Sequence, residues 1–198
     1  MDPVLPILRE LPEELHGARV CVRPYRPGDG PALWEAVEES REHLLPWLPW
    51  GDKHKSPEDS EAFVRKARAQ WLLREDLPYG IWERETDRFL GGTGLHRIDW
   101  ETPSFEIGYW LRRCAVGHGY MTDAVQLLCT LAFETLAANR VFIRCAARNV
   151  RSAAIPRRLG FVHEATLRND RRNTAGELYD MLVFGMTPDD YANAPFRR

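Results

Sequence analysis

Long apolar runs are missing from this sequence of 198 residues. No stretch approaches the roughly 20 apolar residues that a membrane-spanning helix requires. Residues 1–9 hold a short apolar patch, but they carry an early acid and two prolines, and no basic region precedes the patch. They therefore do not resemble a signal peptide, and we expect a soluble protein with no membrane partner.

An excess of charge of one sign is also missing. The 27 basic and 29 acidic side chains leave a formal net charge of −2. A nucleic-acid-binding domain usually carries a clear positive balance, because its basic side chains neutralise phosphates. The composition therefore predicts no nucleic-acid partner.

Cysteine is scarce, and its spacing is uninformative. The four cysteines, at positions 21, 114, 129 and 145, form no Cys-x-x-Cys pair and show no zinc-type spacing with histidine. We therefore expect free thiols in the reducing cytoplasm and no bound metal.

Residues 109–124 join an extended apolar segment to two glycines and then to a helix. The helix is indicated by an apolar stripe at three- and four-residue spacing: Met121, Ala124, Val125, Leu128, Leu131 and Ala132. The free N–H groups of a helix start favour an anion, and Gly117 and Gly119 would let a phosphate approach the backbone. The same glycines would also suit an ordinary strand-to-helix turn, so both interpretations stay open.

A second pattern follows about 30 residues later. Residues 140–146 are typical of a short strand, and after them come Asn149-x-x-Ser152 and the tripeptide at 159–161, Leu-Gly-Phe. Asn149 is suited to cap the short helix that this spacing predicts. Pro156 lies inside that helix and removes the N–H that would bond the Ser152 carbonyl.

Together these two patterns resemble the GNAT superfamily of acyl-CoA-dependent N-acyltransferases. The loop at 116–119, Val-Gly-His-Gly, is similar to the family's pyrophosphate loop, although Cys114 stands where the family has Gln or Arg. In the family this loop binds mainly through backbone N–H groups. The resemblance implies acetyl-CoA as co-substrate and no metal.

Within the superfamily the chain resembles the RimJ/RimL group, which acetylates the N-termini of ribosomal proteins, and the resemblance covers most of the chain. Its marks lie at residues 40–50, 91–95, 107–111, 149–152 and 159–161. It implies an acetyl-CoA-dependent N-acetyltransferase that acts on a protein or peptide N-terminal α-amine by direct attack in a ternary complex. Homodimers are common in such families.

The expected fold is α/β: a single GNAT-type domain over residues 1–198 with a mixed, mostly antiparallel sheet of six to seven strands and about four flanking helices. Strands are expected at 18–25, 79–84, 89–98, 104–112, 141–146, 162–168 and 178–186. Helices are expected at 31–42, at 56–75 with Ser56 as its cap and Pro57 in its first turn, after the glycine loop, and at 150–158. The last ten or so residues are expected to form a loose tail.

Acetyl transfer to an amine needs a base, because an α-amine with a pKa near 8 is largely protonated at neutral pH, and it needs a proton for the departing thiolate. Glu106 stands on the strand before the loop, where several GNAT enzymes carry a general base. Its alternative is a structural pairing with a cross-strand arginine. The family's usual acidic tyrosine is absent, and the resemblance suggests Ser152 in its place. Ser152 could instead bond its own helix backbone.

The resemblance also assigns binding residues. For the cofactor they are Tyr109, Trp110, Leu111, Val116, Gly117, His118, Gly119, Tyr120, Met121, Thr122, Asn149 and Ser152. Trp47 and Trp50 are expected beside the acceptor, and their alternative is packing on the core. An acylated Cys114 is disfavoured, because no His or Asp is adjacent to activate the thiol.

Two other functions remain open. An acetyltransferase of a small amine, such as a polyamine, an aminoglycoside or a metabolite, would need carboxylates at its site. Acids do gather in the acceptor-side segment: Glu38, Glu39, Glu42, Asp52, Glu58 and Asp59. An acyl-CoA-binding module without catalysis is supported only by the missing tyrosine and by Cys114.

Overall fold

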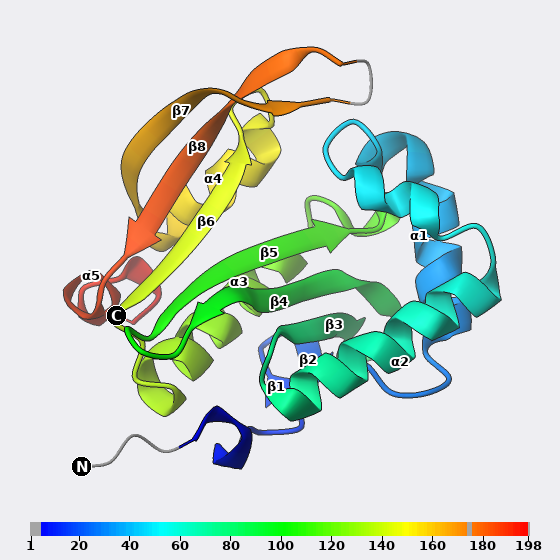
Figure 1. Ribbon diagram of the computed structural model, residues 1–198, viewed down its shortest axis with the longest axis horizontal. Coiled ribbons are helices and arrows are strands. Elements are labelled where there is room, and N and C mark those ends of the chain that lie inside the picture. The colour runs from blue at the N-terminus through cyan, green and yellow to red at the C-terminus, as the bar shows by residue number, and fades with distance from the viewer. Residues whose placement is uncertain (1–4, 174–175, 198) are drawn as a thin grey trace.

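The computed structural model describes residues 5–173 and 176–197. It is an α/β structure built on one eight-stranded sheet with the strand order β1-β2-β3-β4-β5-β6-β8-β7. The helices flank this sheet, as Figure 1 shows. The predicted fold class is confirmed.

The elements follow the predicted order. The strands are β1 Leu15–His16, β2 Val20–Pro24, β3 Leu77–Glu83, β4 Phe89–Asp99, β5 Ser104–Leu111, β6 Arg140–Ala146, β7 Val162–Arg172 and β8 Leu178–Met186. The α-helices are α1 Gly30–Leu44, α2 Pro57–Leu73, α3 Tyr120–Thr130, α4 Val150–Leu159 and α5 Pro188–Ala192. Short 3₁₀ segments lie at Pro6–Leu8, Pro49–Lys53, Arg113–Ala115 and Pro195–Arg197, and a π turn at Leu131–Thr135 continues α3.

The sheet is mostly antiparallel. β1 to β5 form antiparallel neighbours, β5 pairs with β6 in parallel, and β8 pairs antiparallel with both β6 and β7. The eighth strand, beyond the six to seven expected, is the two-residue β1, which pairs with β2 at Leu15–Val22 and His16–Cys21. A two-residue strand is too short to leave an alternating pattern in the sequence.

β5 and β6 separate partway along their length. They pair at Ser104–Arg140, Phe105–Val141 and Glu106–Phe142, and at no later position among the described residues. β5 nevertheless continues to Leu111 and β6 to Ala146. In Figure 1 the two strands diverge toward their carboxyl ends. This opening leaves β5 backbone groups without a strand partner on that edge.

Helices cover both faces of the sheet. In Figure 1, α1 and α2 lie on the near side, and α3 and α4 lie behind the strands. One core cluster joins α1 and α2 to Tyr25, Trp82 and Phe89, and the larger cluster joins α3 and α4 to the other side chains of the strands. β3 serves both clusters because its side chains alternate between the faces. The sheet therefore fixes the starts of α3 and α4 beside the β5–β6 opening.

Local sequence signals explain the helix starts. Ser56 caps α2 by accepting from the Asp59 N–H at 3.1 Å, with Pro57 in the first turn, as the sequence predicts. Thr187 and Asp190 form a capping box at α5.

Tyr191 in α5 is 6% exposed and stacks on Phe133 at 4.7 Å between ring centroids. The expected loose tail is therefore wrong over residues 188–197, because a buried aromatic ring anchors it.

In the described part of the chain, every helix is too short or too polar to cross a membrane.

Candidate active site

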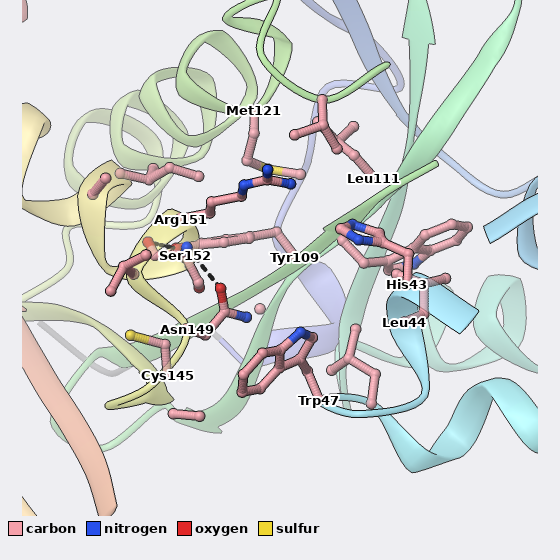
Figure 2. A pocket seen from close by; sticks show the side chains of 18 of the residues that line it. His43, Leu44, Trp47, Tyr109, Leu111, Met121, Cys145, Asn149, Arg151 and Ser152 are labelled. Atoms are coloured by element: carbon pink, nitrogen blue, oxygen red, sulfur yellow. Dashed lines mark hydrogen bonds between the residues drawn. The ribbon is translucent and has the colours of Figure 1, made fainter. Parts of the chain in front are cut away.

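A cleft with a volume of about 1070 Å³ lies at the β5–β6 opening. Its walls come from the carboxyl halves of β5 and β6, the end of α1, the glycine loop with the start of α3, and the start of α4. Figure 2 shows Tyr109, Ser152, Asn149 and Trp47 arranged around this space. Segments far apart in the sequence therefore meet at one cleft.

The glycine loop has a backbone that only glycine adopts readily. Gly117 and Gly119 have φ values of +93° and +83°, in the left-handed region. A Cβ built at Gly117 would meet nothing within 4 Å, and one at Gly119 would lie 3.4 Å from the Arg19 guanidinium. Backbone conformation therefore requires these glycines, and open space remains beside them.

The start of α3 carries free donors. Gly119 precedes the helix, and no side chain among the described residues caps it. Asp123, the acid of the first turn, instead accepts from the backbone N–H groups of Arg19 at 2.7 Å and of Val20, the first residue of β2, at 3.1 Å. Arg158 of α4 donates to the Thr122 hydroxyl at 3.2 Å and adds positive charge. An uncapped helix start beside an arginine is suited to bind an anion.

The start of α4 is capped as predicted. The Asn149 Oδ1 accepts from the Ser152 N–H at 3.1 Å, which Figure 2 marks with a dashed line. In the part of the chain that the structure describes, the Asn149 Nδ2 has no acceptor. The side chain therefore caps its helix with one atom and keeps a donor at the cleft.

Ser152 lies between two other groups of the cleft. Its hydroxyl donates to the Tyr109 hydroxyl at 3.3 Å. Cys145 of β6, the one cysteine among the described cleft-lining residues, also borders Ser152. Burial raises the pKa of the Cys145 thiol. A neutral hydroxyl and a neutral thiol thus share this end of the cleft.

Glu106 lies in the cleft at the point where β5 and β6 separate. Its carboxylate accepts from Arg144 Nε and Nη2, both at 3.2 Å, and pairs with Arg97 Nε at 2.8 Å. The Glu106 side chain is 14% exposed. The cross-strand arginine of the structural alternative is therefore present, and the role of general base stays a prediction.

The chain matches a known protein family over most of its length. Residues 19–162 match the family model described as Acetyltransferase (GNAT) domain. The chain is a GNAT acetyltransferase.

Individual relatives agree with the family. "Putative ribosomal N-acetyltransferase YdaF" of Bacillus subtilis (strain 168) is 29% identical over 168 residues, which cover 84% of this chain and 90% of YdaF. The ribosomal-protein-serine acetyltransferase of Escherichia coli (strain K12) is 30% identical over 69% of this chain and 75% of its own length. The crystallised RimL ribosomal alpha-N-protein acetyltransferase, solved with coenzyme A in a disulfide to a cysteine, is 22% identical. It has a TM-score of 0.80 and covers 90% of this chain and 99% of RimL.

The structure brings most of the predicted cofactor residues of this GNAT protein to the cleft. Tyr109, Trp110, Leu111, Val116, Gly117, Gly119, Tyr120, Met121, Thr122, Asn149 and Ser152 all line it. His118 is outside the lining: its carbonyl accepts from Arg19, and its ring stacks on Tyr120 at 5.8 Å between centroids.

The two tryptophans predicted beside the acceptor lie in different places. Trp47 lines the cleft and faces Asn149 in Figure 2. Trp50 is outside the lining and packs edge-on against Trp110 at 5.5 Å and against His54 at 5.6 Å between centroids. Trp47 therefore stays a candidate for acceptor contact, whereas Trp50 supports the wall behind Trp110.

Basic side chains are the functional feature that the sequence did not reveal. The cleft is lined by His43, Arg113, Arg144, Arg148, Arg151 and Arg158. Burial, then Arg151 and Arg113, lower the pKa of His43, so its imidazole stays neutral near pH 7. The sequence does not indicate that these side chains share one cleft, because they come from four separate segments that only the fold brings together.

The acids of the acceptor-side segment are elsewhere. None of the six predicted carboxylates is among the described cleft-lining residues, of which Glu106 is the one acid. Glu39 is hydrogen-bonded to Arg112, and Glu38 is paired with Arg41 at 2.7 Å. The acidic wall that a polycationic acceptor would need is therefore absent from the described lining.

Cys114 is exposed and does not line the cleft. Burial and the Glu39 carboxylate raise its thiol pKa. A thiolate nucleophile is therefore disfavoured at this position, as the sequence predicts.

Proposed function

We propose that this enzyme transfers the acetyl group of acetyl-CoA to the N-terminal α-amine of a protein or peptide, by direct attack in a ternary complex. The observation that carries the proposal is the single cleft between the uncapped start of α3 and the capped start of α4, at the point where β5 and β6 separate. One end of this cleft suits a diphosphate, and the other holds ionisable groups and an aromatic wall.

The residues present fit acetyl-CoA. The N–H groups of Tyr120, Met121 and Thr122, with Arg158, would bind the diphosphate. The Asn149 Nδ2 is available to donate to the pantetheine arm. RimL is described with its coenzyme in a disulfide to a cysteine. Because Cys145 lines the cleft beside Ser152, we place the thiol end of the coenzyme at these two residues.

The proposed chemistry uses three groups of this chain. Glu106 takes the proton of the attacking amine, directly or through water, with the lone pairs that its arginine partners leave free. Backbone N–H groups of β5 beyond Glu106, which have no β6 partner, donate hydrogen bonds to the thioester carbonyl and polarise it. Ser152 donates a hydrogen bond to the departing thiolate, and such charge-assisted bonds are about twice as strong as neutral ones.

The charges at the cleft favour a peptide over a polyamine. A polycation would approach five arginines and a carboxylate that is already paired twice. A single α-amine can lose its charge on binding, whereas several ammonium groups would each need a partner. The ribosomal names of YdaF and of the Escherichia coli relative point the same way.

We also propose that the domain extends beyond the matched residues 19–162 to the whole chain, because β8 pairs with β6 and completes the sheet. A cytoplasmic location agrees with the ribosomal-protein acceptors that the relatives' names describe and with the four free cysteines.

An acceptor screen tests the proposed function. Peptides that start with Ser, Ala or Met are compared with spermidine, an aminoglycoside and free amino acids, and CoA release is followed with a thiol reagent. We expect a peptide to give the highest kcat/KM, and the same peptide with an acetylated N-terminus, the matched control, to give none. Faster turnover of spermidine would overturn the peptide assignment. Binding of acetyl-CoA without CoA release for any acceptor would overturn catalysis by this chain.

A further inference from the structure

Pro156 interrupts the hydrogen bonds of α4 at the turn that carries Ser152. In an α-helix the carbonyl of one residue accepts from the N–H four positions later. The Ser152 carbonyl would need the N–H of residue 156, which proline lacks. Pro156 is buried in the interior of α4, so water does not readily replace the missing donor.

A tyrosine from another element supplies that donor. The Tyr109 hydroxyl of β5 donates to the Ser152 carbonyl oxygen at 2.9 Å. The contact joins residues 43 positions apart and crosses the opening where β5 and β6 no longer pair. Figure 2 shows Tyr109 reaching Ser152 in this way.

The proton count fixes the direction of the second hydrogen bond. A phenol has one proton, and Tyr109 gives it to the carbonyl. The Ser152 hydroxyl must then donate to the Tyr109 oxygen, at 3.3 Å. Burial raises the pKa of Tyr109, so the phenol stays protonated and keeps its donor. One hydroxyl group thus holds both the backbone and the side chain of Ser152.

We propose that Tyr109 is a positioning residue for Ser152: its hydroxyl replaces the N–H that Pro156 lacks and holds the Ser152 hydroxyl ready for the departing thiolate. The inference rests on the proposed function of Ser152. The 3.3 Å bond between two neutral hydroxyls is weak, so Ser152 can exchange it for a stronger bond to a charged sulfur. The hydrogen bond from the Tyr109 hydroxyl to the Ser152 carbonyl is kept and fixes the position of the first turn of α4.

The test is a rescue experiment with Tyr109→Phe, Pro156→Ala and the double variant. Phenylalanine removes only the hydroxyl, and alanine at 156 restores the helix N–H. We expect Tyr109→Phe to lower kcat about tenfold, the loss of roughly one hydrogen bond, with the KM for acetyl-CoA changed less than about twofold. Pro156→Ala alone should stay within about twofold of the wild type. The kcat of the double variant should recover to within about threefold of the wild type, because the restored N–H of residue 156 donates to the Ser152 carbonyl.

Two results would overturn the proposal. One is an unchanged kcat in Tyr109→Phe while Ser152→Ala is impaired. The other is a loss in Tyr109→Phe that Pro156→Ala leaves unrelieved, which would limit Tyr109 to packing or cofactor contact.

A wild type that releases no CoA with any acceptor would overturn the proposed function instead. The melting temperature then still tests the hydrogen bond: Tyr109→Phe should lower it more when residue 156 is proline than when it is alanine. An equal decrease in both backgrounds would refute the replacement of the N–H by the Tyr109 hydroxyl.

Discussion

Glu39 should anchor the segment that leads from β5 to the glycine loop. The Arg112 side chain, 3% exposed, is hydrogen-bonded to Glu39 at 3.0 Å through Nε and to Glu35 at 2.8 Å through Nη2. Glu39 also accepts from the Cys114 N–H at 3.4 Å. A Glu39→Gln variant removes the charge, keeps the shape, and leaves Arg112 with the Glu35 carboxylate and the Phe89 carbonyl as partners.

The expected loss in the free energy of unfolding follows from the pKa of Glu39. The Arg112 hydrogen bond holds the pKa of Glu39 at about 2, below its ordinary 4.5. At about 1.36 kcal/mol per pKa unit, this difference is an upper bound of about 3.4 kcal/mol. The side chain is 33% exposed, so solvent screening reduces the expected loss to about 1–2 kcal/mol at pH 7.

The pH dependence gives the loss a distinct signature. The folded pKa lies below the unfolded one, so the stabilisation is complete above about pH 4.5 and is lost as the pH falls toward about 2. The free energy of unfolding, measured with urea from pH 7 to pH 3, should therefore differ most between wild type and variant at pH 7, and this difference should shrink below about pH 4.5. The affinity for acetyl-CoA should also fall a few-fold, because the loop loses an anchor.

Glu38→Gln is the matched control, because Glu38 is the neighbouring residue of α1, is 53% exposed and pairs with Arg41. Its expected cost is below about 0.5 kcal/mol, as for exposed pairs in general. Equal losses in the two variants, or a Glu39→Gln loss that stays constant from pH 7 down to pH 3, would show that the charged Glu39–Arg112 pair does not stabilise the fold.

Three further predictions test the cleft. Ser152→Ala should lower kcat more than tenfold, within the roughly 10²–10⁴ range of acid–base catalysis, with an unchanged acetyl-CoA Kd by calorimetry; unaltered turnover would remove Ser152 from the mechanism. Trp47→Ala should raise the peptide KM several-fold in steady-state assays, because Trp47 lines the cleft. Trp50→Ala should instead lower the melting temperature, because Trp50 packs on Trp110. The opposite pattern would exchange the roles of the two tryptophans. CoA disulfide should form a mixed disulfide with Cys145 and release one CoA thiol, seen as an added CoA mass that Cys145→Ser lacks; an adduct confined to Cys114 would contradict the placement of the coenzyme thiol.

The sequence predicts those parts of the fold whose signals are local. The Ser56 cap of α2 and the Asn149 cap of α4 each join residues three positions apart, and the apolar stripe of α3 repeats every three or four residues; the structure has all three. Period-two alternation along the β5 sequence also puts Glu106 and Trp110 on one face. Such patterns are physical consequences of helix and strand geometry.

Features that depend on distant partners could not be predicted. The separation of β5 and β6 depends on where a parallel ladder ends, and nothing at Glu106 marks that position. Trp47 and Trp50 lie in the same proline-rich segment, and only tertiary packing decides which indole reaches the cleft. The acids of that segment are bound by arginines such as Arg112 and Arg41, whose partners the sequence does not reveal. The Tyr109 hydroxyl contacts Ser152, another predicted cofactor residue, because Pro156 lacks the N–H that would otherwise bond the Ser152 carbonyl.

The central claim is that the start of α3 binds the diphosphate of acetyl-CoA. Calorimetric titration of acetyl-CoA into the wild type, Gly117→Glu and Gly117→Gln tests it most directly. Both variants strain the same φ of +93° and place a side chain in the same open space, but only glutamate adds a negative charge. Micromolar binding by the wild type, weakened by glutamine and abolished by glutamate, is the predicted result. Equal binding by all three proteins, or none by the wild type, would exclude the start of α3 as the diphosphate site.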